Sequence, residues 1–149
     1  MFNRRPRHPI RRPQIRTQIE LQRHWQRALP DFGGDQRGLR FMFISIRDTA
    51  SKVGFFSDVT GPLDATQYDG FGRVIVEYFL EGEPRLWRIA FLLTRPGPAV
   101  QTPDDIAWAA SLYDACRRSG VACEIIHVAA GDKVIPLPPD DMPDLAVGF

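Results

Sequence analysis

Apolar residues occur along the chain in short runs that predict strands. Residues 39–46 (LRFMFISI) are largely apolar on both alternating faces, which is typical of a strand inside a sheet covered on two sides. Residues 86–94 (LWRIAFLLT) and 121–128 (VACEIIHV) predict two further strands. Shorter runs at 52–56 and 133–137 predict two more, and the first of these is expected to form a hairpin with 39–46.

Two segments have the apolar spacing of helices. In residues 17–29 apolar side chains recur at near-helical spacing, and Thr17 with Glu20 has the capping-box pattern. Residues 103–119 carry the clearest helical signal, because Thr102 suits the N-cap. The other end signals of this second helix are Pro103 in its first turn, Asp104 and Asp105 at its positive end, Arg117 and Arg118 at its negative end, and Gly120 as the residue that ends it.

The segment between the hairpin and the strand at 86–94 fits more than one structure. Residues 57–70 have the composition of a loop. Residues 71–80 (FGRVIVEYFL) contain a β-branched run that favours a strand, but the spacing of their apolar residues also suits a helix. With either structure, the order strand, loop, strand, helix, strand predicts a single α/β domain, a sandwich built on a mixed sheet.

The composition agrees with one globular domain and adds a charged arm. The chain has 149 residues, of which 44% are hydrophobic and 25% are charged, and its formal net charge is +1. The charge is uneven, because residues 1–40 hold ten arginines against three acidic residues. Residues 1–16 hold six of these arginines with three prolines, which predicts a disordered or extended arm. We therefore divide the chain into this arm, a domain over 17–137 and a Pro/Asp-rich tail over 138–149.

The arm has the charge of a segment that contacts phosphate groups. Phe2 is its only aromatic residue, so an arm that bound DNA or RNA would not read the base sequence. A solvated tail or one that docks onto a partner is the alternative. The candidate phosphate contacts are Arg4, Arg5, Arg7, Arg11, Arg12 and Arg16.

The sequence contains no conventional catalytic or metal-binding motif. None of the three histidines, His8, His24 and His127, has a potential ligand two to four residues further along, and two cysteines make no disulfide framework. The G-x-S-x-G, Walker A and G-x-G-x-x-G patterns are absent. No apolar run approaches the roughly 20 residues of a membrane span, and no apolar segment of a secretory signal follows the arginines. We expect a cytoplasmic protein without a cofactor.

Residues 86–137 are similar to the C-terminal half of RadC-like JAB (MPN/JAMM) domains. In that family an apolar strand ends in His-x-His-Pro-Ser-Gly, a Thr-Pro-Ser-x-x-Asp segment opens a helix, and a strand and a hairpin follow. Here FLLTRPGP (91–98), VQTPDDIA (100–107) and GDKVIPL (131–137) stand in the same order. The resemblance covers roughly 39–137 and implies that the α/β domain has the JAB/MPN, cytidine-deaminase-like fold.

The resemblance also implies where the metal site of the family would lie. Asp105 matches the metal-binding aspartate, and Thr102 stands where the family has a serine. The two histidine positions fall on Leu92 and Thr94, neither of which binds zinc as imidazole does. Asp58 is the only acid near the expected place of the catalytic glutamate. The chain therefore resembles a pseudoenzyme that has too few ligands to hold the metal.

Three functions remain open at this point. The first is a non-catalytic JAB-like domain that binds a protein partner. The second is a hydrolase that uses the same cleft without zinc, with Arg95 as an anion clamp beside Thr94, Asp105 and Asp58. The third is an accessory protein for DNA or RNA, in which the arginine arm supplies non-specific affinity. None of the three involves a membrane.

Overall fold

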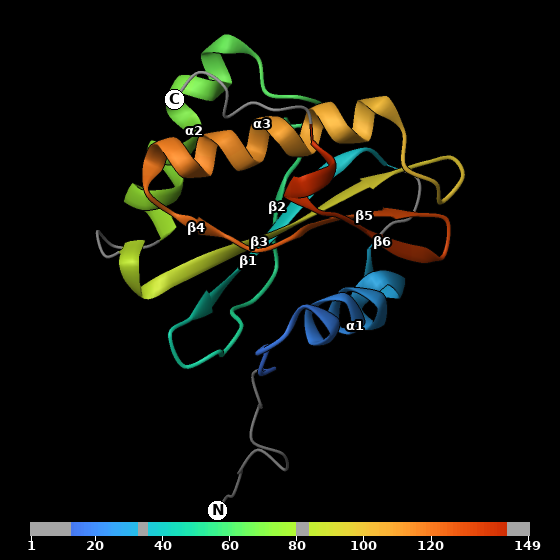
Figure 1. The fold of residues 1–149 in the computed structure, drawn as a ribbon, viewed down its shortest axis with the longest axis horizontal. Helices are drawn as coiled ribbons and strands as arrows, with labels where there is room; N and C mark the ends of the chain where they lie inside the picture. The colour runs from blue at the N-terminus through green and yellow to red at the C-terminus, as the bar shows by residue number, and fades with distance from the viewer. Residues whose placement is uncertain (1–12, 33–35, 80–83, 143–149) are drawn as a thin grey trace, which may run out of the picture.

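The computed structural model describes residues 13–32, 36–79 and 84–142. In this part of the chain a six-stranded mixed sheet separates two layers of helix: α2 and α3 cover one face and α1 lies against the other (Figure 1). The helices are α1 (Gln18–Ala28), α2 (Ala65–Phe79) and α3 (Pro103–Ser119), with single 3₁₀ turns η1 (Leu29–Asp31), η2 (Pro84–Leu86) and η3 (Pro139–Asp141). The strands are β1 (Gly38–Ser45), β2 (Gly54–Phe56), β3 (Trp87–Arg95), β4 (Ala122–Cys123), β5 (Ile126–Ala130) and β6 (Lys133–Leu137).

Strand β3 is the centre of the sheet, whose order is β2-β1-β3-β5-β6. It runs antiparallel to β1 along its whole length and parallel to β5, while β4 pairs with its first residues. Both outer pairs, β1 with β2 and β5 with β6, are antiparallel. The parallel pair needs a crossover, and α3 supplies it between β3 and β5.

The predicted strands at 39–46, 52–56, 86–94 and 133–137 are confirmed with small differences at their ends. The strand predicted over 121–128 is wrong in one respect, because it is broken into β4 and β5. Cys123 pairs with Ile89 and His127 pairs with Leu92, so this segment uses one residue more than β3 over the same distance. Such an extra residue breaks the pairing locally in the manner of a bulge.

The segment with two possible structures is a helix. α2 begins at Ala65, inside the stretch that the sequence predicted as a loop. The reason is a reciprocal cap, in which the Asp64 carboxylate accepts from the Gln67 N–H at 2.7 Å and the Gln67 side chain accepts from the Asp64 N–H at 3.0 Å. Phe71 and Ile75 are buried four residues apart, which is the spacing of one helix face.

The last residues of the segment predicted as a disordered or extended arm pack against the domain, which the sequence did not indicate. Residues 1–12 lie outside the part that the structure describes, but 13–16 pack onto the domain. The Ile15 N–H donates to the Asp48 carbonyl at 2.7 Å, the Ala50 N–H donates to the Pro13 carbonyl at 2.9 Å, and the Ile15 side chain is 1% exposed. The start of the Pro/Asp-rich tail is also docked, because η3 contacts α3 and Met142 packs against the core below it.

The sheet has a hydrophobic core on each face. The α3-side core joins the inward residues of the sheet to α2 and α3 and includes Phe91, Trp108 and Leu112. The smaller α1-side core lies between the sheet and α1 and consists of Ile15, Leu21, Trp25, Met42, Ile44, Ala50, Ala90, Leu92, Ala129 and Val134. Among the described residues, no helix is long and apolar enough to cross a bilayer.

Candidate functional site

The C-terminal half of β3 carries two of the positions that the sequence singled out. Neighbouring residues of a strand point to opposite faces, so Leu92 and Thr94 face α1 whereas Arg95 faces α3. Leu92 is completely buried in the α1-side core. The Thr94 hydroxyl lies 3.1 Å from the Gln36 carbonyl and 3.3 Å from the Gly38 carbonyl, so it donates its proton to the neighbouring backbone.

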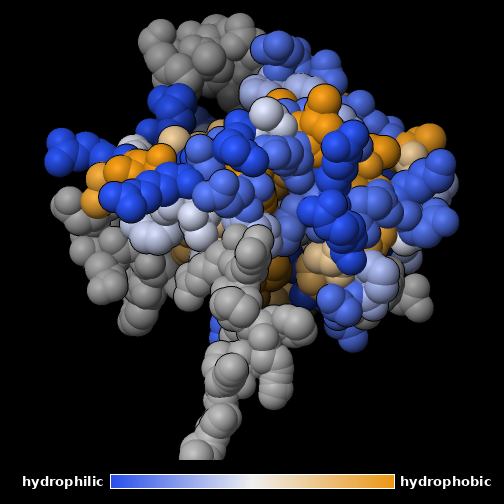
Figure 2. Space-filling view, turned by 90° about the horizontal axis from the view of Figure 1, so that it is seen from below, coloured by the Kyte–Doolittle hydropathy of each residue, from blue (hydrophilic) through white to orange (hydrophobic). Residues whose placement is uncertain are grey.

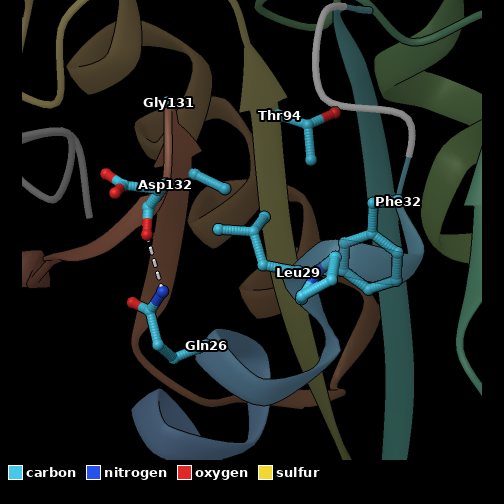
Figure 3. Close-up of a pocket in the computed structure, with 8 residues that line it drawn as sticks. Gln26, Leu29, Phe32, Thr94, Gly131 and Asp132 are labelled. Atoms are coloured by element: carbon cyan, nitrogen blue, oxygen red, sulfur yellow. Dashed lines mark hydrogen bonds between the residues drawn. The ribbon is translucent and has the colours of Figure 1, made fainter.

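A pocket of about 290 Å³ opens beside Thr94 on this face. Figure 3 shows that the Thr94 hydroxyl turns away from the pocket, while its methyl group points toward Leu29 and Phe32. The pocket surface is therefore mainly apolar at this end. The residues that line it come from the end of α1, from η1, from β3 and from the β5–β6 turn: Gln26, Leu29, Pro30, Phe32, Thr94, Ala129, Gly131 and Asp132.

Gln26 holds the two sides of the pocket together. Its side-chain N–H donates to the Asp132 carbonyl at 2.7 Å, and its side-chain oxygen accepts from the Val134 N–H at 3.1 Å. Gly131 has φ +63°, a left-handed conformation that glycine adopts at low cost, and this lets the chain reverse between β5 and β6. The Asp132 carboxylate points outward from the pocket (Figure 3).

Arg40 stacks beside the pocket in a position that sequence reasoning missed. Its guanidinium carbon lies 4.2 Å from the centre of the Phe32 ring and 4.4 Å from that of Phe55. Burial lowers the pKa of Arg40, and among the described residues its Nε–H has no hydrogen-bond acceptor. The sequence did contain a signal, because Arg40 is the single arginine in the apolar run 39–46 and lies on its α1-facing side. A cation held between two aromatic rings explains an arginine at such a position.

Arg95 and Asp105 form a buried ion pair on the other side of the sheet. The Arg95 side chain is 5% exposed and that of Asp105 is not exposed, and the two groups are joined by hydrogen bonds of 2.6 and 2.7 Å. The remaining N–H groups of Arg95 donate to the carbonyls of Pro96, Pro98 and Val100. All five donors of the guanidinium are therefore used to hold the loop between β3 and α3.

The same pair sets the protonation of both groups. Its hydrogen bond to Asp105 raises the pKa of Arg95. Burial pushes the pKa of Asp105 upward, but the hydrogen bonds from Arg95 and from the Thr102 N–H outweigh it, so the pKa lies below its ordinary value.

The predicted N-cap is confirmed, since the Thr102 hydroxyl accepts from the Asp105 N–H at 3.1 Å and Gly120 ends α3 with φ +74°.

The predicted site residues are thus divided between the two faces. Thr102, Arg95 and Asp105 are together, whereas Leu92 and Thr94 lie on the α1 face. Asp58 is exposed in the loop after β2, and its carbonyl accepts from Gln67. Of the arm arginines, the exposed side chain of Arg16 pairs with Glu20 at 3.7 Å. The other arm positions, Arg4, Arg5, Arg7, Arg11 and Arg12, lie outside the described residues.

His127 is a buried neutral histidine on the α1 face. Burial lowers its pKa to about 4, and its Nε2 lies 3.2 Å from the Gln18 side-chain nitrogen, which donates to it. Glu124 does not contact it and instead pairs with Arg88 at 2.6 Å. Within residues 13–32, 36–79 and 84–142, no group of three or more His, Cys, Asp or Glu side chains is placed to hold a metal ion.

Comparison with known proteins adds no relative. No protein-family model matches the chain, and no curated protein matches its sequence. The similarity to RadC-like JAB domains rests on the residues of this chain and stays a prediction.

Proposed function

We propose that this protein is a non-catalytic binding module on a JAB-like α/β domain, and that it recognises a protein partner at the C-terminal end of β3. One observation carries the proposal. Thr94 stands where the resemblance places the second histidine, and it presents a methyl group to a pocket rather than a ligand to a metal. Its hydroxyl is bound to backbone carbonyls.

The size and surface of the pocket suit one apolar side chain of a partner. Sites for drug-sized ligands measure roughly 300–1,000 Å³, so a volume of about 290 Å³ is at their lower limit. Leu29, Phe32 and the Thr94 methyl give apolar contacts, and Gln26 has both ends of its amide bound to the chain. An inserted leucine or phenylalanine side chain would displace water from these surfaces without leaving a polar group unpaired.

The residues present do not fit a zinc ion of the JAB type. Both oxygens of Asp105 accept hydrogen bonds from Arg95, and Leu92 is apolar. The hydrolase alternative with Arg95 as an anion clamp has no support either, because the five donors of Arg95 already have acceptors within the protein.

Selection of peptides from a random displayed library tests the proposal directly. We expect the selected peptides to share one apolar anchor residue and to bind the Leu29→Arg variant more than about tenfold more weakly, because the arginine places a charge on the pocket wall. Ile19→Arg is the matched control, since Ile19 lies on α1 and is 58% exposed. Peptides that bind both variants equally well would refute the pocket as the binding site.

Metal analysis tests the other half of the proposal. Protein purified without chelator and dialysed is expected to retain far less than one equivalent of zinc. A full equivalent that survives dialysis, and that Asp105→Asn releases, would contradict a non-catalytic module.

A further inference from the structure

A second pocket, of about 180 Å³, lies along α1, from Glu20 in its first turn to Arg27 in its last. The segment before α1 forms one wall and the helix forms the other. This segment is fixed, because its backbone pairs with Asp48 and Ala50 and the Ile15 carbonyl accepts from Arg88 at 2.7 Å. The lining residues are Pro13, Gln14, Ile15, Glu20, Arg23, His24 and Arg27.

Two arginines of this pocket lie exposed on the surface of α1. Arg23 and Arg27 are four residues apart and exposed, so they lie on one side of the helix. Neither makes a hydrogen bond or an ion pair with a described residue, whereas Arg16, Arg37 and Arg88 all do. Two guanidinium groups on neighbouring turns repel each other, and a bound anion would relieve that repulsion.

The carboxylate of the pocket is already engaged. One oxygen of Glu20 accepts from the Arg16 N–H at 2.7 Å and from the Thr17 N–H at 3.1 Å, as part of the helix cap, and the other lies 3.7 Å from the Arg16 guanidinium. These contacts hold the pKa of Glu20 below its ordinary value. The charge of Arg23 also lowers the pKa of Glu20, so this one carboxylate is shared between Arg16 and Arg23. With Arg27 also in the lining, the pocket keeps a net positive charge.

His24 supplies a neutral donor at the same place. Burial and the nearby Arg27 lower its pKa, so at neutral pH the ring is uncharged and one ring nitrogen carries a proton. Figure 2 looks onto this side of the molecule, where hydrophilic residues make up most of the described surface. The pocket is thus lined by two exposed guanidinium groups and an uncharged imidazole.

We propose that this pocket binds a phosphate group, and that the phosphate belongs to the backbone of a nucleic acid. Arginine pairs bidentately with phosphate oxygens, and two arginines one turn apart can hold successive oxygens of one group. Pro13 lines the pocket, and in the sequence it directly follows Arg11 and Arg12, which three further arginines precede. This concentration of positive charge suits a polyanion more than a single ion. The proposed contacts are to phosphate oxygens, which are the same in every nucleotide, so binding at this pocket is expected not to depend on base sequence.

Fluorescence polarisation with labelled single-stranded and duplex DNA and RNA of about 20 nucleotides tests this site on the full chain. The variant Arg23→Ala/Arg27→Ala is expected to lose about tenfold or more in affinity, and the slope of log K against log salt should fall by about 1, because the two arginines share one phosphate group. Arg23→Lys/Arg27→Lys should recover part of the affinity, because it keeps the charge and loses the fork.

The control is Arg73→Ala/Arg85→Ala, which removes the same charge from two exposed arginines on α2 and η2. It should leave the affinity within about twofold of wild type. In wild-type protein the ring signals of His24 in NMR spectra should shift when the oligonucleotide is added.

Three results would overturn the proposal. The first is wild-type affinity and salt slope in Arg23→Ala/Arg27→Ala, which would place any binding in the arm alone. The second is tighter binding of an acidic peptide than of every oligonucleotide. The third is His24 signals that respond to inorganic phosphate but not to the oligonucleotides, which would make free phosphate the ligand.

Discussion

The two faces of the sheet differ in how completely helices cover them. On the α3 face two helices enclose a continuous core with large aromatic residues, and the buried charges of Arg95 and Asp105 are paired with each other there. On the α1 face one helix and a short extended segment cover a smaller core, and both pockets described above open beside that helix. A close-packed face gives stability and excludes ligands, whereas an incompletely covered face leaves surfaces for binding.

Replacing the two fully buried tryptophans should reveal the largest difference in stability between the two faces. Trp108 lies in the α3-side core and Trp25 in the α1-side core. Each replacement by alanine removes a large buried side chain and should cost about 3–5 kcal/mol of unfolding free energy. We expect Trp108→Ala to lower hydrogen-exchange protection across the sheet and Trp25→Ala to lower it mainly in α1. Equal losses everywhere would show that the two faces unfold as one unit, and the comparison would fail.

Breaking the buried ion pair of the α3 face should cause the next largest loss of stability. Asp105→Asn leaves the Arg95 charge without its partner and should cost about 3–4 kcal/mol at pH 7. The folded-state pKa of Asp105 is lowered, so the contribution is complete above the ordinary carboxylate value of about 3.9 and is lost as the pH falls through the lowered pKa. The difference in unfolding free energy between wild type and Asp105→Asn, measured by urea unfolding, should therefore become smaller in acid.

The neighbouring carboxylate is the matched control for this measurement. Asp104 pairs with Arg37 at 2.6 Å, but its side chain is 54% exposed. Asp104→Asn should cost no more than about 1 kcal/mol. If it costs as much as Asp105→Asn, burial is not what gives the inner pair its strength.

On the α1 face the corresponding buried polar group is His127, and its effect depends on pH. The folded protein binds a proton there with a pKa of about 4, whereas the unfolded chain does so near 6.5. Between these values only the unfolded chain takes up the proton, so stability falls as the pH drops from about 6.5 to 4, by about 3 kcal/mol in total.

Replacing His127 by leucine should remove this dependence. Urea unfolding of His127→Leu at pH 7.5, 5.5 and 4.5 is the measurement, and the variant should lose less stability than wild type over this range. An equal loss in both proteins would assign the acid sensitivity to other groups.

The smallest expected loss of stability comes from removing the helix caps, one on each face. Thr17 caps α1 and Thr102 caps α3, each through the same reciprocal arrangement. Replacement by alanine should cost about 1 kcal/mol in either helix. The Thr102 hydroxyl accepts from the N–H of Asp105, the residue whose carboxylate binds Arg95, so we expect Thr102→Ala to be the more costly of the two. Thermal unfolding of both variants, with Thr60→Ala as an exposed control, decides the order.

Local signals in the sequence predicted the parts of this fold that depend on neighbours along the chain. Thr102 and Gly120 mark the ends of α3 by their own conformations, and the long apolar runs mark β1 and β3. The cap of α2 is also local, but its Asp64 lies in a stretch with the composition of a loop. The docking of Ile15 could not be predicted, because one apolar residue among arginines and prolines does not indicate what it packs against.

The candidate site was harder to predict, because the contacts that decide its chemistry leave no mark in the pattern of apolar and polar residues. Arg95 was expected to bind an anion, but the carboxylate and carbonyls that occupy it come from the following loop and helix. The apolar pocket is assembled from Leu29, Thr94 and Asp132, among others, and no local pattern relates these positions. Which way the Thr94 hydroxyl turns depends on the carbonyls of Gly38, in β1, and of Gln36, just before it.

The central place of β3 also decides when the sheet can form during synthesis. β1 pairs with β3 at Gly38 and Thr94, which are 56 residues apart, and β5 comes later still. Before β3 leaves the ribosome, β1 has only the three-residue β2 as a partner, and a lone two-stranded hairpin is marginal in water. The nascent chain must therefore hold the apolar run of β1 without its sheet until most of the domain has been made, which gives chaperones a defined segment to protect.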